Sequence, residues 1–314
     1  MTAAARAETN LDFMSVRKPL AFISIVAVIA SVVLLGVRGL NLGLDFTGGT
    51  LVEVGSAEDI VLDDIRASME DAGLTEAVVQ YFGSSRDVMV RVPPQEDLNG
   101  IEEDDELGQR LYELMAERVP GLELRRVEFV GPQVGDELRD QSGLAMLMAL
   151  GLMMLYVWFR FTNKFGIATV AALFHDVLVV LGIFSLMQWS FDLTVMAAVL
   201  AIIGYSLNDT IVVADHIRDD FQNSRMTDPE AIINQALNKT LSRTLVTSLT
   251  TLLVLVSLYL FGGEIMKGFS VALILGVIVG TYSSIYVASN VLMLMKVDKE
   301  DFMLPEPEEL DEMP

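Results

Sequence analysis

The sequence predicts a polytopic α-helical membrane protein, with six transmembrane helices and one small α+β domain between the first two of them. Hydrophobic residues make up 52% of the 314 residues and the mean hydropathy is +0.48, which is more apolar content than a soluble globular protein usually carries. The formal net charge is −22. The charge is concentrated in residues 45–140 and after Asp298, whereas the apolar segments are nearly free of it. This separation predicts membrane spans plus an acidic domain in water.

The first apolar segment runs from Leu20 to Val37, directly after Arg17 and Lys18. It is long for the core of a cleaved signal peptide and long enough to cross a bilayer about 30 Å thick, and no clear A-x-A cleavage site follows. We therefore expect an uncleaved transmembrane helix over residues 19–38. Five more apolar runs predict a five-helix bundle within residues 141–296; they cover residues 143–159, 166–187, 193–214, 245–261 and 269–295.

Lysine and arginine residues in the short loops predict the orientation. With six spans they gather on one side, which is then cytoplasmic, whereas the short loops on the other side hold only Lys267. Residues 1–18 and the acidic tail 297–314 are therefore predicted to be cytoplasmic, and residues 39–140 to lie outside. The residues that decide this are Arg17, Lys18, Arg160, Lys164, Arg218, Arg225, Lys239, Arg243, Lys296 and Lys299.

The external segment has the pattern β-α-β-β-α-β, which is typical of a ferredoxin-like domain. Alternation of apolar and polar residues predicts the strands, and apolar residues at helical spacing predict the helices. Such a fold hosts many functions and does not identify one. The predicted elements cover residues 50–54, 56–72, 78–82, 88–92, 101–119 and 122–130.

The composition excludes several classes of function. The chain has no cysteine, which excludes disulfides and thiolate metal sites, and its acidic surface argues against nucleic-acid binding. No P-loop and no Ser-His-Asp arrangement is present, so we expect neither an enzyme nor a cofactor. A metal site is not expected either, because His175 and Asp176 cannot complete a coordination shell and the other histidine, His216, lies at a membrane edge.

Asp209, in the fourth predicted span, is the strongest indication of function. A charged carboxylate deep in a bilayer costs about 2.5–3.5 kcal/mol on insertion scales, so such residues usually serve a purpose. Burial raises the pKa of a carboxyl group, and a nearby cation lowers it. A site that alternates between these two environments can take up a proton on one side of the membrane and release it on the other. The alternative is a buried, protonated aspartate that bonds to a neighbouring helix.

Arg243 opens the fifth span and has two interpretations. It could anchor the helix by extending its side chain to the membrane surface, in accord with the positive-inside rule. It could also be the counter-charge of Asp209, because the fourth span runs inward and the fifth outward, which places both residues toward the cytoplasmic half.

Other polar residues in the spans have weaker signals. His175 and Asp176 point about 100° apart on one helix, so they cannot both face one partner. For His175, a satisfied buried polar group and direct proton transfer both stay open. A hydroxyl-rich stretch that includes Thr247 and Ser248 could hold water or pack helices together; its other members are Thr244, Thr250 and Thr251. Gly276 and Gly280 form a G-x-x-x-G pair, which favours close helix packing, and Ser283 and Ser284 could join a polar interior.

Several motifs resemble those of the SecF family. The segment LDFTGGT of residues 44–50 follows the first span, and GYSLNDTIVV of residues 204–213 contains Asn208 and Asp209. LFGGE at 260–264 and GTYSS at 280–284 are also similar. The resemblance covers about residues 11–297. One departure is visible: Ala214, Asp215 and His216 stand where many relatives have an aromatic residue, Asp and Arg, and its effect is open.

The resemblance implies a six-span subunit of the resistance-nodulation-division class in the bacterial inner membrane, with its soluble domain in the periplasm. It implies a protein-export role driven by the proton gradient, with SecD as a separate chain, the SecYEG channel, the translocating unfolded polypeptide and protons as partners. It places the proton path on Asp209 and Arg243, with Asn208 beside them. For Asp45 and the following Gly48-Gly49, the residues alone suggest a tight turn, and the resemblance adds contact with a partner or with a moving external domain.

Two alternatives remain at this point. One is a proton-driven exporter of small molecules or lipids from the same class, although such pumps usually have a repeated twelve-span body. The other is a non-conducting assembly factor that steadies SecD or the channel, in which Asp209 would have only a structural role.

Overall fold

Among the described residues of the computed structural model, six helices are long and apolar enough to cross a membrane, and the six predicted spans fall on them, the last extending one residue past its helix. The structure describes residues 11–94, 104–298 and 301. A short 3-10 helix, η1, precedes the first span. The elements are η1 Met14–Val16, α1 Arg17–Val37, α5 Pro132–Arg160, α6 Asn163–Met187, α7 Leu193–Asn223, α8 Pro229–Phe261 and α9 Glu264–Leu294.

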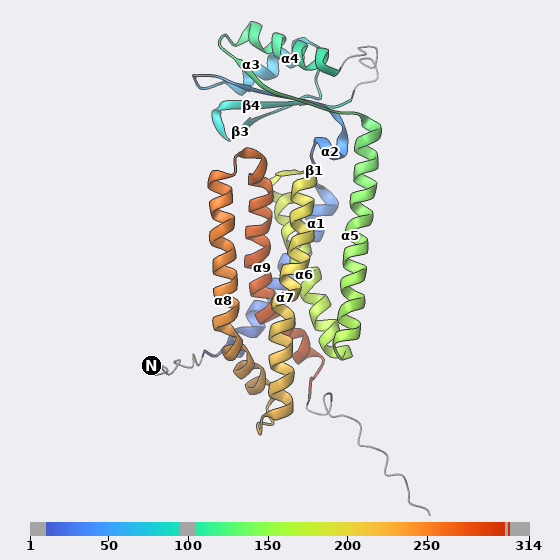
Figure 1. Cartoon of the computed structure of the whole chain (residues 1–314), viewed down its shortest axis with the longest axis vertical. Helices are drawn as coiled ribbons and strands as arrows, with labels where there is room; N and C mark the ends of the chain where they lie inside the picture. Colours follow the sequence, from blue (N-terminus) through green and yellow to red (C-terminus); the bar gives the residue numbers. More distant parts are fainter. Residues whose placement is uncertain (1–10, 95–103, 299–300, 302–314) are drawn as a thin grey trace, which may run out of the picture.

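Several helices extend beyond their apolar runs. α5 starts at the sheet domain with Pro132 in its first turn, a position where the missing N–H costs nothing, and runs from there down the length of the bundle (Figure 1). α8 begins at Pro229 after Asp228, whose carboxylate accepts a hydrogen bond from the N–H of Glu230. The apolar runs of the sequence predicted the membrane parts of these two helices but not the polar turns with which they begin.

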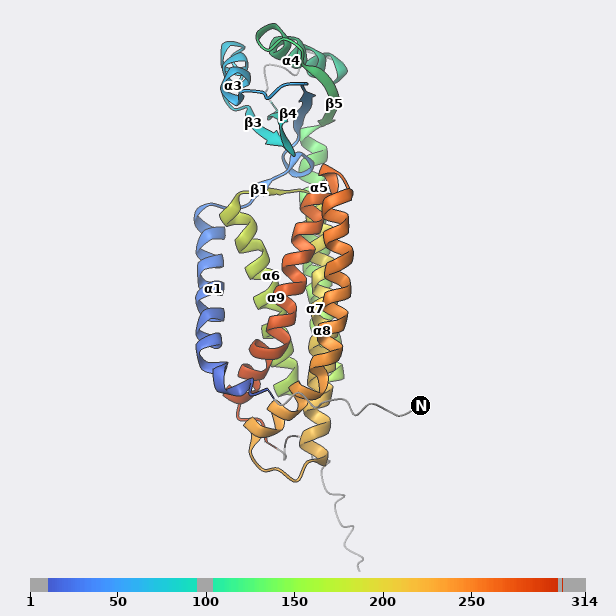
Figure 2. The same ribbon diagram turned by 90° about the vertical axis from the view of Figure 1, so that its left-hand side faces the viewer.

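α9 lies at the centre of the bundle and packs against α6, α7 and α8, while α1 lies to one side against α6 and α9 (Figure 2). Gly276 and Gly280 of α9 face α7. A Cβ atom added at Gly276 would lie 2.2 Å from Cγ1 of Ile202, and one at Gly280 would lie 3.1 Å from Cβ of Ser206. The two glycines therefore let α9 approach α7 closely.

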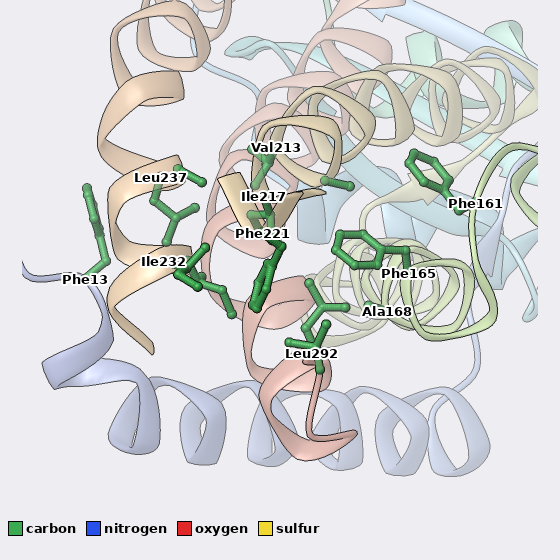
Figure 3. Packing of buried hydrophobic residues seen from close by; sticks show 14 of the residues in the cluster. Phe13, Phe161, Phe165, Ala168, Val213, Ile217, Phe221, Ile232, Leu237 and Leu292 are labelled. Atoms are coloured by element: carbon green, nitrogen blue, oxygen red, sulfur yellow. The ribbon is translucent and has the colours of Figure 1, made fainter. Parts of the chain in front are cut away.

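Aromatic and aliphatic side chains close the end of the bundle that lies away from the sheet (Figure 3). Phe161 and Phe165 stack, with ring centroids 6.4 Å apart, and Phe221 of α7 and Leu292 of α9 belong to the same buried cluster. Phe13 belongs to this cluster too, and its backbone N–H donates to the side-chain oxygen of Asn234 at 2.8 Å. The segment before α1 is thus fixed to the start of α8.

The segment between α1 and α5 forms a separate layer above the bundle (Figure 1). Four antiparallel strands pair in the order β3-β4-β2-β5. Two helices cover one face of this sheet, and Ile65, Met69, Leu111 and Met115 form its apolar core with strand valines. The elements are β2 Gly49–Gly55, α3 Leu62–Asp71, β3 Val78–Phe82, β4 Ser84–Val92, α4 Asp104–Arg118 and β5 Glu123–Val130.

The order of these elements is the predicted one, with shifted boundaries. α3 begins at Leu62 rather than at residue 56, and β4 begins at Ser84 rather than at 88 because the hairpin turns at Gly83 with φ +83°. Residues 101–103 of the second predicted helix lie outside the described residues, as do residues 1–10 and 302–314 of the predicted termini.

Three short elements join the sheet to the bundle. β1 Asn41–Leu42 pairs in parallel with β6 Ser190–Phe191, and the four-residue helix α2 Leu44–Thr47 follows β1. Gly48 and Gly49 end α2 with φ of +67° and +113°, a backbone region that favours glycine. The tight turn expected here is therefore a short helix closed by two left-handed glycines.

Candidate functional site: two buried carboxylates among hydroxyls

Asp209 of α7 lies buried between α8 and α9. Its Oδ1 accepts a hydrogen bond from Thr244 of α8 at 2.9 Å, and its Oδ2 accepts one from Ser284 of α9 at 2.6 Å. Both hydroxyls are themselves buried. The carboxyl group is thus held by neutral donors from two other helices, with one donor on each oxygen.

Asp176 of α6 forms a second polar site and is completely buried. Its Oδ2 accepts hydrogen bonds from Ser206 of α7 and from Ser283 of α9, the latter at 2.7 Å. Its Oδ1 lies 2.9 Å from Nδ1 of His175, the preceding residue. Asp176 therefore ties α6, α7 and α9 together.

The two sites are joined through both α7 and α9. Ser283 contacts Asp176 and its neighbour Ser284 contacts Asp209. On α7, Ser206 and Asp209 are three residues apart and so lie on one face of the helix. The structure thus brings the two carboxylates into one polar layer inside the bundle.

Two further sets of hydroxyl contacts join α9 to its neighbours, one to α7 and α8 and the other to α1. Ser248 lies 2.7 Å from Thr281 of α9 and accepts a longer bond of 3.4 Å from Tyr205 of α7. The hydroxyl of Tyr282 lies 2.7 Å from Ser24 of α1 and donates to the carbonyl of Leu20. Sequence reasoning missed Ser206, Tyr205 and Tyr282 as partners, although the spacing of Ser206 from Asp209 was a usable signal.

Arg243 does not pair directly with Asp209: no ion pair within 4.0 Å joins the two side chains in the described part of the chain. The Arg243 side chain is exposed on α8, and so is Thr247, whose hydroxyl bonds to the carbonyls of Arg243 and Thr244. Asn208 is exposed as well and points away from the buried layer.

The residues that depart from the family pattern lie near the far end of α7. Asp215 forms a two-pronged ion pair with Arg160 of α5, at 2.7 and 2.9 Å. Nδ1 of His216 lies 2.9 Å from the carbonyl of Val212 in its own helix. Neither residue contacts Asp209. Within the described residues, no group of three His, Asp or Glu side chains is arranged to hold a metal ion.

A cavity of about 500 Å³ lies between the uncovered face of the sheet and the nearby end of the bundle. Glu53, Arg91 and Arg126 line it from the sheet, and Asp192 and Lys267 from the bundle. Burial raises the pKa of Glu53 despite the opposing effect of Arg126, and burial lowers the pKa of Arg91. The cavity is therefore lined by charges of both signs.

Comparisons with known proteins fit this architecture. The family described as "Protein export membrane protein SecD/SecF, C-terminal" matches residues 111–298, and the "SecD/SecF GG Motif" matches residues 33–59. The protein translocase subunit SecF of Vibrio alginolyticus is 45% identical and covers 98% of both chains. The chain belongs to the SecF family. The SecF of Pseudomonas aeruginosa is 46% identical over 95% of each chain.

Solved structures of SecDF are also similar to this SecF-family chain. The crystal structure of SecDF from Thermus thermophilus, described as a translocon-associated membrane protein, has a TM-score of 0.83 at 35% identity over 94% of this chain. A crystal structure of SecDF in a super-membrane-facing form has a TM-score of 0.67 at 34% identity. This chain spans only 40% of the length of either SecDF chain.

Proposed function

We propose that this chain is a SecF subunit of the Sec protein translocase. Together with SecD, it would couple the proton gradient to the export of proteins across the bacterial inner membrane. It acts as a transport component rather than as an enzyme. The observation that carries the proton-coupled part is the buried carboxyl group of Asp209, which is held by hydroxyl groups and by no cation within 4.0 Å in the described part of the chain.

Hydroxyl partners suit a group that binds and releases a proton. A hydroxyl can donate to a carboxylate and can also accept from a carboxylic acid. Ser284 is placed for both roles, because its Oγ lies 2.6 Å from Asp209 and 3.0 Å from the carbonyl of Thr281. When Asp209 is protonated, its O–H can donate to Ser284, whose own proton then turns to Thr281. Both protonation states are satisfied without movement of a helix.

We assign the counter-charge role to Arg243. An arginine exposed to lipid in a span is costly, so the α8 face that carries Arg243 and Thr247 is suited to contact with another protein rather than with acyl chains. A separate SecD subunit is the partner proposed for this face. Asn208 next to Asp209, and the possible participants His175, Asp176, Thr247 and Ser248, complete the proposed proton pathway.

The sheet domain is proposed to be ferredoxin-like and periplasmic. The element order β-α-β-β-α-β and the antiparallel strand order support the fold. The distribution of short-loop lysine and arginine supports the location, with both termini cytoplasmic. In this arrangement the domain faces the exit of the SecYEG channel and engages the emerging polypeptide.

The test is export into inverted membrane vesicles that contain SecYEG, SecD and this chain, with and without a proton gradient. Asp209→Asn should abolish the part of export that depends on the gradient, while the complex with SecD still forms. Asp219→Asn is the matched control, because Asp219 is exposed on the same helix. Unchanged gradient-dependent export in Asp209→Asn would refute the proton-carrier role and favour an assembly factor.

A further inference from the structure

The connection between α1 and the sheet domain is fastened on two sides. Arg91 of β4 donates to the carbonyl of Leu42, so the sheet holds the connection at that residue. Three residues later, Oδ2 of Asp45 accepts a hydrogen bond of 2.9 Å from the backbone N–H of Leu193, the first residue of α7. One short segment is thus bonded to the external sheet and to the helix that carries Asp209.

Close packing leaves this segment little freedom to slide. The N–H of Gly43 donates to the carbonyl of Phe191 at 2.8 Å, and a Cβ atom at Gly43 would lie 2.9 Å from Cβ of Asp192. The buried ring of Phe46 stacks on Phe191 with centroids 6.1 Å apart. The segment is therefore pressed against the turn that begins α7.

The two glycines after α2 fix the other end. A Cβ atom at Gly49 would lie 2.3 Å from the carbonyl oxygen of Val92 in β4, and one at Gly135 of α5 would lie 2.8 Å from the nitrogen of Gly48. The chain enters the sheet domain at Gly49 and leaves it shortly before Gly135. The two segments that connect the sheet domain to the bundle are in contact at these glycines. A displacement of the domain is therefore passed directly to α2.

α7 can carry such a displacement into the membrane. It is a continuous helix from Leu193 to Asn223 without a proline. Asp209 lies sixteen positions beyond Leu193, which at 1.5 Å per residue is about 24 Å along the axis. A push or rotation at the first turn of α7 therefore changes the position of Asp209 relative to Thr244 and Ser284 on the neighbouring helices.

We propose that Asp45 is a positioning residue that couples the external domain to the proton site by holding the first turn of α7. The coupling part of this proposal rests on the proposed role of Asp209, whereas the attachment itself does not. The helix has its own N-cap, since Asp192 accepts from the N–H of Val195 at 2.8 Å. Asp45 is thus an additional bond to α7 that comes from the domain connection.

Three variants distinguish coupling of the external domain to α7 through Asp45 from simple capping of α7. Asp45→Ala removes the acceptor for Leu193. Asp45→Asn keeps an acceptor oxygen and removes only the charge. Asp192→Ala weakens the first turn of α7 from within that turn and leaves the Asp45 bond in place. It is the matched control for fraying.

Attachment is measured by spin-label distances in the complete complex with SecD. The natural chain has no cysteine, so Glu70→Cys on the exposed side of α3 and Phe261→Cys at the end of α8 give one labelled pair. We expect the distance distribution to broaden in Asp45→Ala and to stay narrow in Asp45→Asn and Asp192→Ala. A narrow distribution in Asp45→Ala, or equal broadening in Asp192→Ala, would overturn the proposal.

Coupling is measured as gradient-dependent export in the same vesicles. Asp45→Ala should lower it at least fivefold, and Asp45→Asn should restore most of it. Loss of attachment with unchanged export would also overturn the proposal. If Asp209→Asn itself keeps gradient-dependent export, the proposed function fails. In that case the distance measurement still decides whether Asp45 attaches the domain to α7.

Discussion

Gly276 sets the distance between the helix that carries Asp209 and the central helix α9. A Cβ atom there would lie 2.2 and 2.9 Å from Cγ1 and Cγ2 of Ile202. Both atoms branch directly from Cβ, so a change of rotamer exchanges one clash for another. Ile202 is only 1% exposed, and its side chain has no open space to enter. Gly276→Ala is therefore expected to push α7 and α9 apart.

The size of the effect follows from two opposing contributions. Overpacking of a filled core costs about 1–3 kcal/mol, whereas alanine gains up to about 1 kcal/mol over glycine in an unobstructed helix. Gly151→Ala on α5 is the matched control, because nothing lies within 4 Å of its added Cβ atom. Both variants gain the helix propensity of alanine, so they should differ by the overpacking cost alone, about 1–3 kcal/mol, which is about 5- to 150-fold in the unfolding equilibrium.

Gly280→Ala should fall between these variants, because its Cβ atom would lie 3.1 Å from Cβ of Ser206 and a small shift relieves the contact. The assay is equilibrium unfolding in mixed micelles with increasing dodecyl sulfate, followed by tryptophan fluorescence. The order of stability should be Gly151→Ala, then Gly280→Ala, then Gly276→Ala. A Gly276→Ala protein as stable as the Gly151→Ala protein would refute the close contact between α7 and α9.

Two further predictions concern carboxyl groups. Burial raises the pKa of Glu53 above its ordinary value of 4.5, so the folded domain binds this proton more tightly than the unfolded chain does. The domain therefore loses stability as the pH rises from 4.5 through the raised pKa of the folded state. Glu53→Gln should flatten this pH dependence of stability. It should also slow hydrogen exchange of the β2 backbone amides at neutral pH, and an unchanged exchange rate would contradict the prediction. Asp176→Leu should leave the hydroxyl of Ser206 without its acceptor and destabilise the bundle by about 1–3 kcal/mol, whereas Ser283 keeps a second acceptor in the carbonyl of Gly280. Asp176→Asn should cost less in the same unfolding assay.

The membrane helices could be predicted from the sequence because each is a long apolar run, and length and hydropathy decide whether a segment spans. The polar first turns of α5 and α8 could not, because hydropathy carries no signal there. The element order of the sheet domain followed from residue alternation and glycine turns. The short pair of β1 and β6 was missed, since two-residue strands far apart in the sequence have no periodicity.

The candidate site was predicted in part. Asp209 stood out because a carboxylate in an apolar run is costly, and that argument needs no partner. Its partners could not be assigned, because the rotation of α8 and α9 about their axes depends on packing across the bundle. Thr244 and Ser284 were noted only as hydroxyls in spans. Arg243 as the counter-charge stays a prediction, and its exposed position makes SecD part of any test.

The two buried carboxylates are suited to different roles. Asp176 is fully buried and has three partners, two of them hydroxyls on the same oxygen and the third His175. That many partners fix the side chain and three helices with it, so any change of its charge state disturbs them all. Asp209 is 8% exposed and has one hydroxyl on each oxygen. Since Ser284 has a second acceptor in Thr281, Asp209 can change its proton without stranding a hydrogen-bonding group. Ser283 likewise has a second acceptor, the carbonyl of Gly280 at 3.1 Å, so the two sites differ in burial and in the number of partners. This difference favours Asp209 as the proton carrier and Asp176 as the anchor that holds its helix in place.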